Sequence, residues 1–190
     1  MKNEKKNKPE VFERNIKIES GAINEEARTV DLTFSSEEPY ERDTWDYGEV
    51  MEVLSHNKED VDMSRLQDGA AVLVNHDSGD QIGVVERAEI GDDKRGRATV
   101  RFGKSARAEE IFSDVIDGIR RNISVGYRWL KAVVEPVKDE KPLLRVNWLP
   151  MEISFASVPA DASIGVGRSD EQAVIPAEEK KKITLILIEE

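Results

Sequence analysis

Apolar and polar residues alternate along residues 28–36, where Val30, Leu32 and Phe34 are separated by polar neighbours. This period of two predicts a half-buried β-strand. Short apolar runs bounded by turn-forming residues predict the other strands. They span residues 50–54, 70–77, 81–90, 97–102, 122–130, 143–149 and 151–158. Residues 37–49 are expected to form a loop, and residues 60–68 to hold a short helical turn.

One segment has the pattern of an amphipathic helix, residues 105–121. Its apolar face is predicted to consist of Ile111, Phe112, Val115, Ile116 and Ile119. Ser105 is the expected N-cap, and two arginines suit the C-terminal end of the helix dipole. One helix among at least seven strands predicts an α+β fold.

The chain has 190 residues, enough for one domain with a sizeable core. Residues 1–10 are polar and Lys-rich and are expected to form a mobile arm. The folded domain is predicted to cover residues 11–168. Residues 169–190 are expected to be a charged linker followed by an apolar segment, ITLILI at 183–188.

Composition excludes several function classes. A formal charge of -11 argues against nucleic acid as a partner, because phosphate binding needs concentrated Lys and Arg. The longest apolar run is far shorter than the roughly 20 residues of a membrane-spanning helix, and no secretory signal is recognisable. We therefore expect a cytoplasmic protein that does not enter a membrane. With no cysteine, disulfides, thiolate metal ligands and cysteine nucleophiles are excluded.

The chemistry-bearing residues are few. Of the two histidines, His56 fits a structural or solvated role, whereas His76 ends an apolar strand and precedes a polar loop. Ser124 lies on the small-residue face of its predicted strand and is followed by Gly126. Glu152 interrupts an apolar strand, where a buried acid requires a partner. A serine nucleophile needs a base and an orienting carboxylate, which makes these three residues a candidate triad.

Three segments together resemble the prohead serine proteases of tailed phages, which are related in fold to the herpesvirus assembly proteases. They are LVNHDSGDQIGVV at 73–85, RRNISVGYRW at 120–129 and LPMEISFASVPADASIGVGR at 149–168. The resemblance covers residues 12–168 and implies His76 as general base and Ser124 as nucleophile. Glu152 takes the third place by position, with Asp77 and Asp161 as alternatives.

The resemblance also implies a fold and a function. The fold would be a partly closed, mainly antiparallel β-barrel surrounded by a few helices. The activity would be that of a serine endopeptidase, acting through an acyl-enzyme without metal or cofactor. Its expected partners are the scaffold protein or segment and the major capsid protein, with self-cleavage and self-association, inside the immature capsid in the host cytoplasm.

Three points stay open at this stage. The oxyanion-hole donors are not identified, although Gly126 and the arginines 120, 121, 128 and 168 are candidates. A non-catalytic module of the same fold that binds capsid or scaffold is the main alternative function. A metal-dependent hydrolase using His76 with Asp77 or Asp80 is a third, although it lacks further strong ligands.

Overall fold

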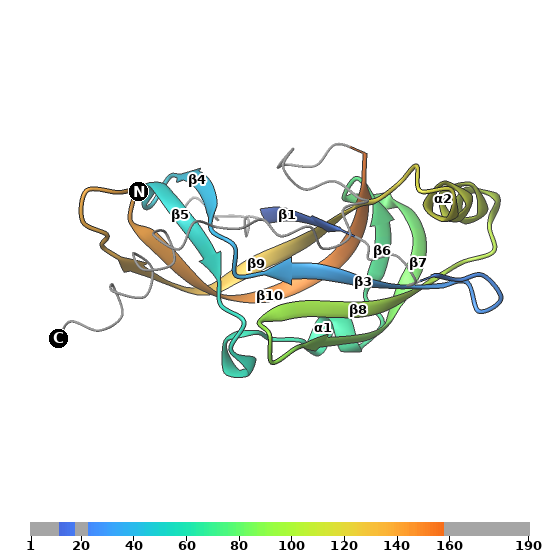
Figure 1. Ribbon diagram of the computed structural model, residues 1–190, viewed down its shortest axis with the longest axis horizontal. Helices are drawn as coiled ribbons and strands as arrows, with labels where there is room; N and C mark the ends of the chain where they lie inside the picture. Colours follow the sequence, from blue (N-terminus) through green and yellow to red (C-terminus); the bar gives the residue numbers. More distant parts are fainter. Residues whose placement is uncertain (1–11, 18–22, 158–190) are drawn as a thin grey trace, which may run out of the picture.

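The computed structural model describes residues 12–17 and 23–157, which form a curved sheet with helical segments at its margins (Figure 1). The strands are β1 (Phe12–Lys17), β2 (Ile23–Asn24), β3 (Thr29–Ser36), β4 (Tyr40–Thr44), β5 (Gly48–Leu54), β6 (Ala71–Val74), β7 (Asp77–Ile90), β8 (Arg95–Phe102), β9 (Asn122–Glu135) and β10 (Leu143–Ala156). The helical segments are η1 (Lys58–Asp60), α1 (Ser64–Gln67) and α2 (Ala106–Ile116). The prediction of a mainly β, α+β fold is confirmed.

The strands pair in the order β1-β9-β10-β6-β7-β8-β3-β2. Strand β10 also pairs in parallel with β5, through Leu143–Val146, and with β6, through Ile153–Phe155. The other strand pairs are antiparallel. Within residues 12–17 and 23–157, β1 and β2 stand at opposite ends of the order and do not pair with each other. The sheet is therefore open and not closed into a barrel, which corrects that part of the expectation.

Strand β10 is continuous where the sequence predicts two strands. Pro150 interrupts the pattern, but it pairs with Tyr127, and the next pair is Glu152 with Gly126. Met151 is thus the extra residue of a β-bulge. Proline is tolerated at a bulge, because the ladder is already interrupted there. The bulge bends β10 just before the predicted site.

Helix α2 is shorter than predicted, although its start is correct. The Ser105 side chain accepts a hydrogen bond from the Ala108 N–H, as an N-cap does. At the other end Gly118 has a φ of +69°, and the Gly118 and Ile119 N–H groups bond to carbonyls of the last turn. This is a Schellman termination. It leaves Ile119 70% exposed instead of on the buried face.

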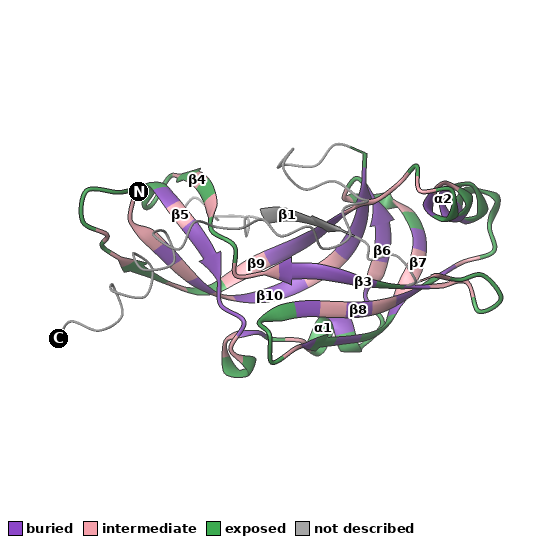
Figure 2. Cartoon of the chain, viewed as in Figure 1, coloured by how far each residue is buried: buried purple, intermediate pink, exposed green. Residues whose placement is uncertain are grey.

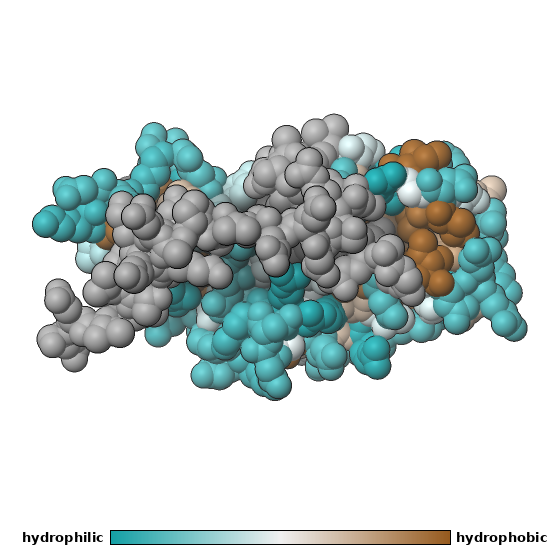
Figure 3. Space-filling model, viewed as in Figure 1, coloured by the Kyte–Doolittle hydropathy of each residue, from teal (hydrophilic) through white to brown (hydrophobic). Residues whose placement is uncertain are grey.

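The core lies on one face of the long strands. Trp148 of β10 contacts Tyr127 of β9 and Phe34 of β3, with ring centroids 5.6 Å and 6.4 Å apart. Buried segments run along β3, β6, β9 and β10 (Figure 2). In the view of Figure 3 the surface is mainly hydrophilic, with hydrophobic surface beside α2. Because Ile123, Val125 and Tyr127 face this core, their neighbours on β9 face the opposite side.

Two segments depart from the predicted pattern for local reasons. The loop predicted at residues 37–49 contains β4, which pairs with β5 through a tight turn at residues 45–47. Because β4 consists mostly of charged residues, it lacks the alternation of apolar and polar residues that predicts a strand. Strand β7 begins at Asp77 and not at residue 81, since a hairpin turn directly follows β6.

Several predicted features lie outside the described residues. These are the arm at 1–10, the domain boundaries at 11 and 168, and the linker and apolar segment at 169–190. Among the residues that the structure does describe, no helix is long and apolar enough to span a membrane.

Candidate functional site

His76 occupies the tip of the β6–β7 hairpin. Val74 pairs with Asp77, so Asn75 and His76 form a two-residue turn, with φ values of +51° and +59°. Two successive left-handed residues define a type I′ turn, where Asn is favoured first and Gly second. A histidine in the glycine position costs about 1 kcal/mol or more of backbone strain. Its side chain must therefore make interactions that offset this cost.

Ser124 and Glu152 come from neighbouring strands. Ser124 in β9 pairs with Ser154 in β10, and Glu152 pairs with Gly126 at the bulge of β10. A Cβ atom placed on Gly126 would lie only 2.2 Å from Glu152 Oε1. Gly126 therefore provides the space in which the Glu152 carboxylate lies. This is a different role from the oxyanion-hole donor considered from the sequence.

The three predicted residues form one chain of hydrogen bonds. His76 Nδ1 lies 2.6 Å from Glu152 Oε1, and His76 Nε2 lies 2.7 Å from Ser124 Oγ. A carboxylate only accepts, which assigns the proton of the neutral ring to Nδ1. Ser124 then donates to Nε2. This is the arrangement in which a base can remove a serine proton while a carboxylate orients the base.

Ser154 completes the network, and no role was assigned to it from the sequence. Its hydroxyl donates to Glu152 Oε2 at 2.8 Å and accepts from the His76 backbone N–H at 3.0 Å. It therefore links the carboxylate to the strained turn. The available signal was its position on the same face of the strand as Glu152.

The site is closed to a large molecule in this conformation. Ser124 is 1% exposed, and the side chains of His76 and Glu152 are 15% and 13% exposed. A substrate carbonyl could reach Ser124 Oγ only if neighbouring groups moved.

The alternative carboxylates are engaged elsewhere or not described. Asp77 accepts a hydrogen bond from the Gly79 N–H at the start of β7. Asp80 binds Arg107 at 2.8 Å, and this hydrogen bond lowers the Asp80 pKa. Asp161 lies outside the described residues.

His56 is buried, in agreement with a structural role. Its Nε2 lies 2.8 Å from Ser35 Oγ, and its Nδ1 lies 2.8 Å from the Leu54 carbonyl oxygen. Within residues 12–17 and 23–157, no group of three His, Cys, Asp or Glu residues could hold a metal ion.

The candidate oxyanion-hole arginines differ in their surroundings. Arg120 pairs with Asp114 and Ser157, and Arg121 donates to the Gly118 carbonyl. Arg168 is not among the described residues. Arg128 has a buried Nε with no hydrogen-bond partner. Within residues 12–17 and 23–157, Arg120 and Arg128 make no hydrogen bond to a triad residue.

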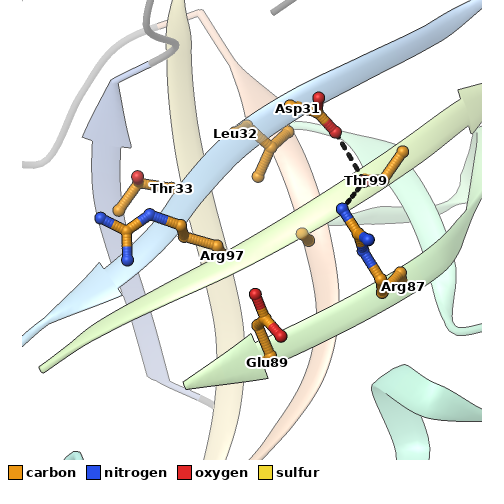
Figure 4. A pocket seen from close by; sticks show the side chains of 8 residues that line it. Asp31, Leu32, Thr33, Arg87, Glu89, Arg97 and Thr99 are labelled. Atoms are coloured by element: carbon orange, nitrogen blue, oxygen red, sulfur yellow. Dashed lines mark hydrogen bonds between the residues drawn. The ribbon is translucent and has the colours of Figure 1, made fainter. Parts of the chain in front are cut away.

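One pocket of the described chain lies away from this site. It is on the outer surface of β3, β7 and β8 (Figure 4). Its lining residues are Asp31, Leu32, Thr33, Arg87, Glu89, Arg97, Ala98 and Thr99. Thr99 bridges Asp31 and Arg87 by hydrogen bonds. The pocket includes no residue of the triad.

The fold and the site together define a mainly β protein with a hydrogen-bonded Ser–His–Glu array. The chain is similar to the major capsid protein of Halomonas phage phiHAP-1, with 47% identity over 145 residues. The alignment covers 74% of this chain and 23% of that protein, so the chain spans about a quarter of its relative. No protein-family model and no solved structure matches the chain. The chain is thus related in sequence to a phage capsid protein.

This relationship corrects the prediction of a serine endopeptidase. The relative is named as a capsid protein, a structural component, and not as an enzyme. The broader expectation of a phage capsid-related protein is confirmed. The resemblance to prohead proteases is supported only to that extent.

Proposed function

We propose that the chain is a capsid-assembly module of a tailed phage, which acts by binding other capsid polypeptides. The observation that carries this proposal is the 47% identity to the phiHAP-1 major capsid protein. Its partners would be the major capsid protein and scaffold, and its place the immature capsid. Because the chain spans only a quarter of that relative, these partners belong to the proposal and not to the comparison.

The closed site is compatible with a binding role. The Ser124–His76–Glu152 chain joins the β6–β7 turn to β9 and β10, and Ser154 adds two further bonds. Buried hydrogen bonds of this kind stabilise one arrangement of neighbouring strands. In this role the network holds the β6–β7 turn, β9 and β10 in fixed positions relative to one another. A binding surface formed by these elements would depend on that arrangement.

The proposal is tested by co-expressing the full chain with the major capsid protein and scaffold of the same phage. The chain should sediment with the assembled shells. In shells formed with a matched Ser124→Ala variant the protein masses should be the same, because assembly by binding needs no Ser124 nucleophile, although loss of the bond to His76 is expected to lower the amount of chain retained. Shells that never retain the chain would contradict the proposal, and so would capsid polypeptides cut in the wild type but not in Ser124→Ala.

The hydrogen-bond geometry favours a second proposal about the site residues alone. Ser124 would be a reactive hydroxyl, with His76 as its base and Glu152 as the group that orients His76. The 2.6 Å and 2.7 Å bonds support these roles, since both partners of the imidazole are in place. This proposal concerns the reactivity of one hydroxyl and not the cleavage of a peptide.

A small fluorophosphonate probe tests this reactivity by intact mass. The wild-type chain should gain one adduct at Ser124, slowly because the site is closed. Ser124→Ala should gain none, and His76→Gln should react at least about a hundredfold more slowly, the range expected for loss of a general base. A wild-type chain that gains no adduct, or a His76→Gln variant that reacts equally, would rule out an activated serine.

A further inference from the structure

Strand β9 has a free edge over its second half. Strand β1 pairs with β9 only from Asn122 to Tyr127, whereas β10 follows β9 as far as Glu135. Within residues 12–17 and 23–157, no strand pairs with the outer edge of residues 128–135. Such an edge presents N–H and C=O groups that can pair with another chain.

The free edge also carries exposed apolar side chains. Leu130, Val133 and Val134 are 55%, 45% and 43% exposed. They are three of the seven large hydrophobic residues that are exposed in the described chain. This concentration on eight residues of one edge indicates an interaction surface.

Opposite charges lie at the two ends of this edge. Arg128, at its start, has a buried Nε without a hydrogen-bond partner. The Arg128 side chain as a whole is only partly buried, so its positive charge can attract an acidic group of a partner. Glu135, at the other end, accepts from Arg145 through Oε1 at 2.9 Å, and no contact of the described chain uses its second oxygen.

We propose that two copies of this chain associate by antiparallel pairing of their β9 edges, with the two-fold axis at Ala132. Leu130 is already the extra residue of a bulge, because Trp129 pairs with Trp148 and Lys131 with Asn147. If Leu130 stays unpaired in the dimer as well, the residues on both sides of it can pair with the second copy. The ladder then places Arg128 opposite Glu135, Trp129 opposite Val134, Lys131 opposite Val133, and Ala132 opposite Ala132 of the second copy.

This register matches the two faces of the strand. Within one copy, Trp129, Ala132 and Val134 pair with β10 residues that are fully buried in the core. Residues on the opposite face of β9 include Arg128 and Glu135. Each cross-copy pair therefore joins side chains of the same face, as antiparallel pairing requires. The edge is self-complementary in charge and in shape, with a small residue at the axis.

The chain's own N-terminal residues suit this edge less well. Residues 2–10, KNEKKNKPE, contain four lysines, two glutamates and a proline, and no aliphatic side chain. Such a sequence offers no apolar side chains to pair with Leu130 and Val133, and proline has no N–H to donate to a strand ladder. A second copy is therefore a better occupant than residues 2–10.

This dimer would contribute to the proposed capsid-assembly function, and its biological purpose rests on that proposal. Its test does not, because it uses the isolated chain. Opposite residues of an antiparallel pair lie about 4.5–5.5 Å apart at Cα, within the range of a disulfide. The chain has no cysteine. A full-length Ala132→Cys variant should therefore form a disulfide-linked dimer on mild oxidation, whereas the exposed β7 variant Glu89→Cys should stay largely unlinked.

Sedimentation of the isolated full chain tests the equilibrium itself. The wild type should dimerise reversibly, and Arg128→Glu should raise the dissociation constant at least about tenfold, because two equivalent charge contacts are lost. Arg87→Glu on β7 makes the same change in net charge and should leave the constant unchanged.

A wild-type chain that stays monomeric at millimolar concentration would overturn the inference. Equal linking of Ala132→Cys and Glu89→Cys would also overturn it, as would equal effects of Arg128→Glu and Arg87→Glu. Because no capsid protein is present, a failure here is distinct from a failure to sediment with shells.

Discussion

Gly126 leaves room for the Glu152 carboxylate, which packs directly against it. A larger residue at position 126 should therefore displace this carboxylate. In Gly126→Ala the new Cβ would lie 2.2 Å from Glu152 Oε1, so the carboxylate must move away from His76. We expect a loss of about 1–3 kcal/mol in the free energy of unfolding, the usual cost of overpacking. Urea denaturation measures this loss.

Gly103→Ala is the matched control for this change. Its Cβ would meet its nearest atom at 3.4 Å, an ordinary contact. Nitrogen NMR should find neutral His76 protonated at Nδ1 in the wild type and in Gly103→Ala, but not uniformly so in Gly126→Ala. Equal stability and equal His76 tautomers in both variants would refute the role given to Gly126.

At the residue scale, the sequence singled out three residues that the structure brings together, but not the residues around them. His76, Ser124 and Glu152 stand out by type and position, and the structure joins them by hydrogen bonds. The roles of Ser154 and Gly126 depend on the register of β9 against β10, including the bulge at Met151. The register between two strands is not encoded in the local pattern of either strand.

At the scale of elements, a buried carboxylate ties three strands together. Glu52 of β5 accepts hydrogen bonds from Arg42 of β4 at 2.5 Å, and from Tyr127 and Trp129 of β9 at 2.8 Å and 2.7 Å. Burial lowers the Arg42 pKa, but Tyr127 and Glu52 together outweigh it and leave that pKa raised. The guanidinium thus stays charged beside Glu52.

Glu52→Gln should therefore destabilise the fold by about 3 kcal/mol, because it leaves the Arg42 charge uncompensated in a half-buried place. Thermal or urea unfolding measures the change. Glu86→Gln, on the exposed surface of β7, is the control and should change stability by less than about 1 kcal/mol. A Glu52→Gln variant as stable as this control would show that the ion pair contributes nothing.

Asp60, at the end of η1, makes part of the stability dependent on pH. Hydrogen bonds from Ser55, Asn57 and Asn147 lower its pKa below 3.8, against an opposing effect of burial. A lowered folded-state pKa adds stability above the unfolded value, and that stability is lost as the pH falls through the folded value. When the pH is lowered from 7 to below 3.8, the free energy of unfolding should thus fall more in the wild type than in Asp60→Asn.

Urea denaturation of both proteins across this range measures the difference. Asp62→Asn serves as a comparison. Hydrogen bonds to Ser64 also lower the Asp62 pKa, so this variant too should lose less stability in acid than the wild type. It should leave the link between η1 and β10 intact. Parallel stability curves for wild type and Asp60→Asn would contradict the prediction.

Elements were predictable where the pattern is local and strong. The alternation of β3 and the N-cap of α2 gave their positions directly. Strand β4 was missed, because its residues YERDT are mostly charged and its pairing with β5 is what makes it a strand. The early end of α2 depends on Gly118, which a helical periodicity alone does not register.

For the whole molecule, the sequence indicated a single mainly β domain but not the path of the sheet. The parallel pairing of β10 with both β5 and β6 joins segments about 80 to 90 residues apart.

The same long-range pairing predicts that protection from amide hydrogen exchange differs between strands. Amide hydrogen exchange should be slowest in the buried middle of β9 and β10 and fastest in β4, which lies at an edge and is half-exposed. Uniform protection across these strands would contradict this gradient.

The central place of β10 also sets an order of events during synthesis on the ribosome. Strands β5, β6 and β9 are all made before β10, yet each needs β10 as a neighbour. The sheet therefore cannot be completed until nearly all of the described chain has left the ribosome. Because such distant pairings close slowly, the nascent chain has a long period with unpaired strands. Glu152 emerges last of the triad, so the Ser–His–Glu array can form only when translation of the folded region is complete.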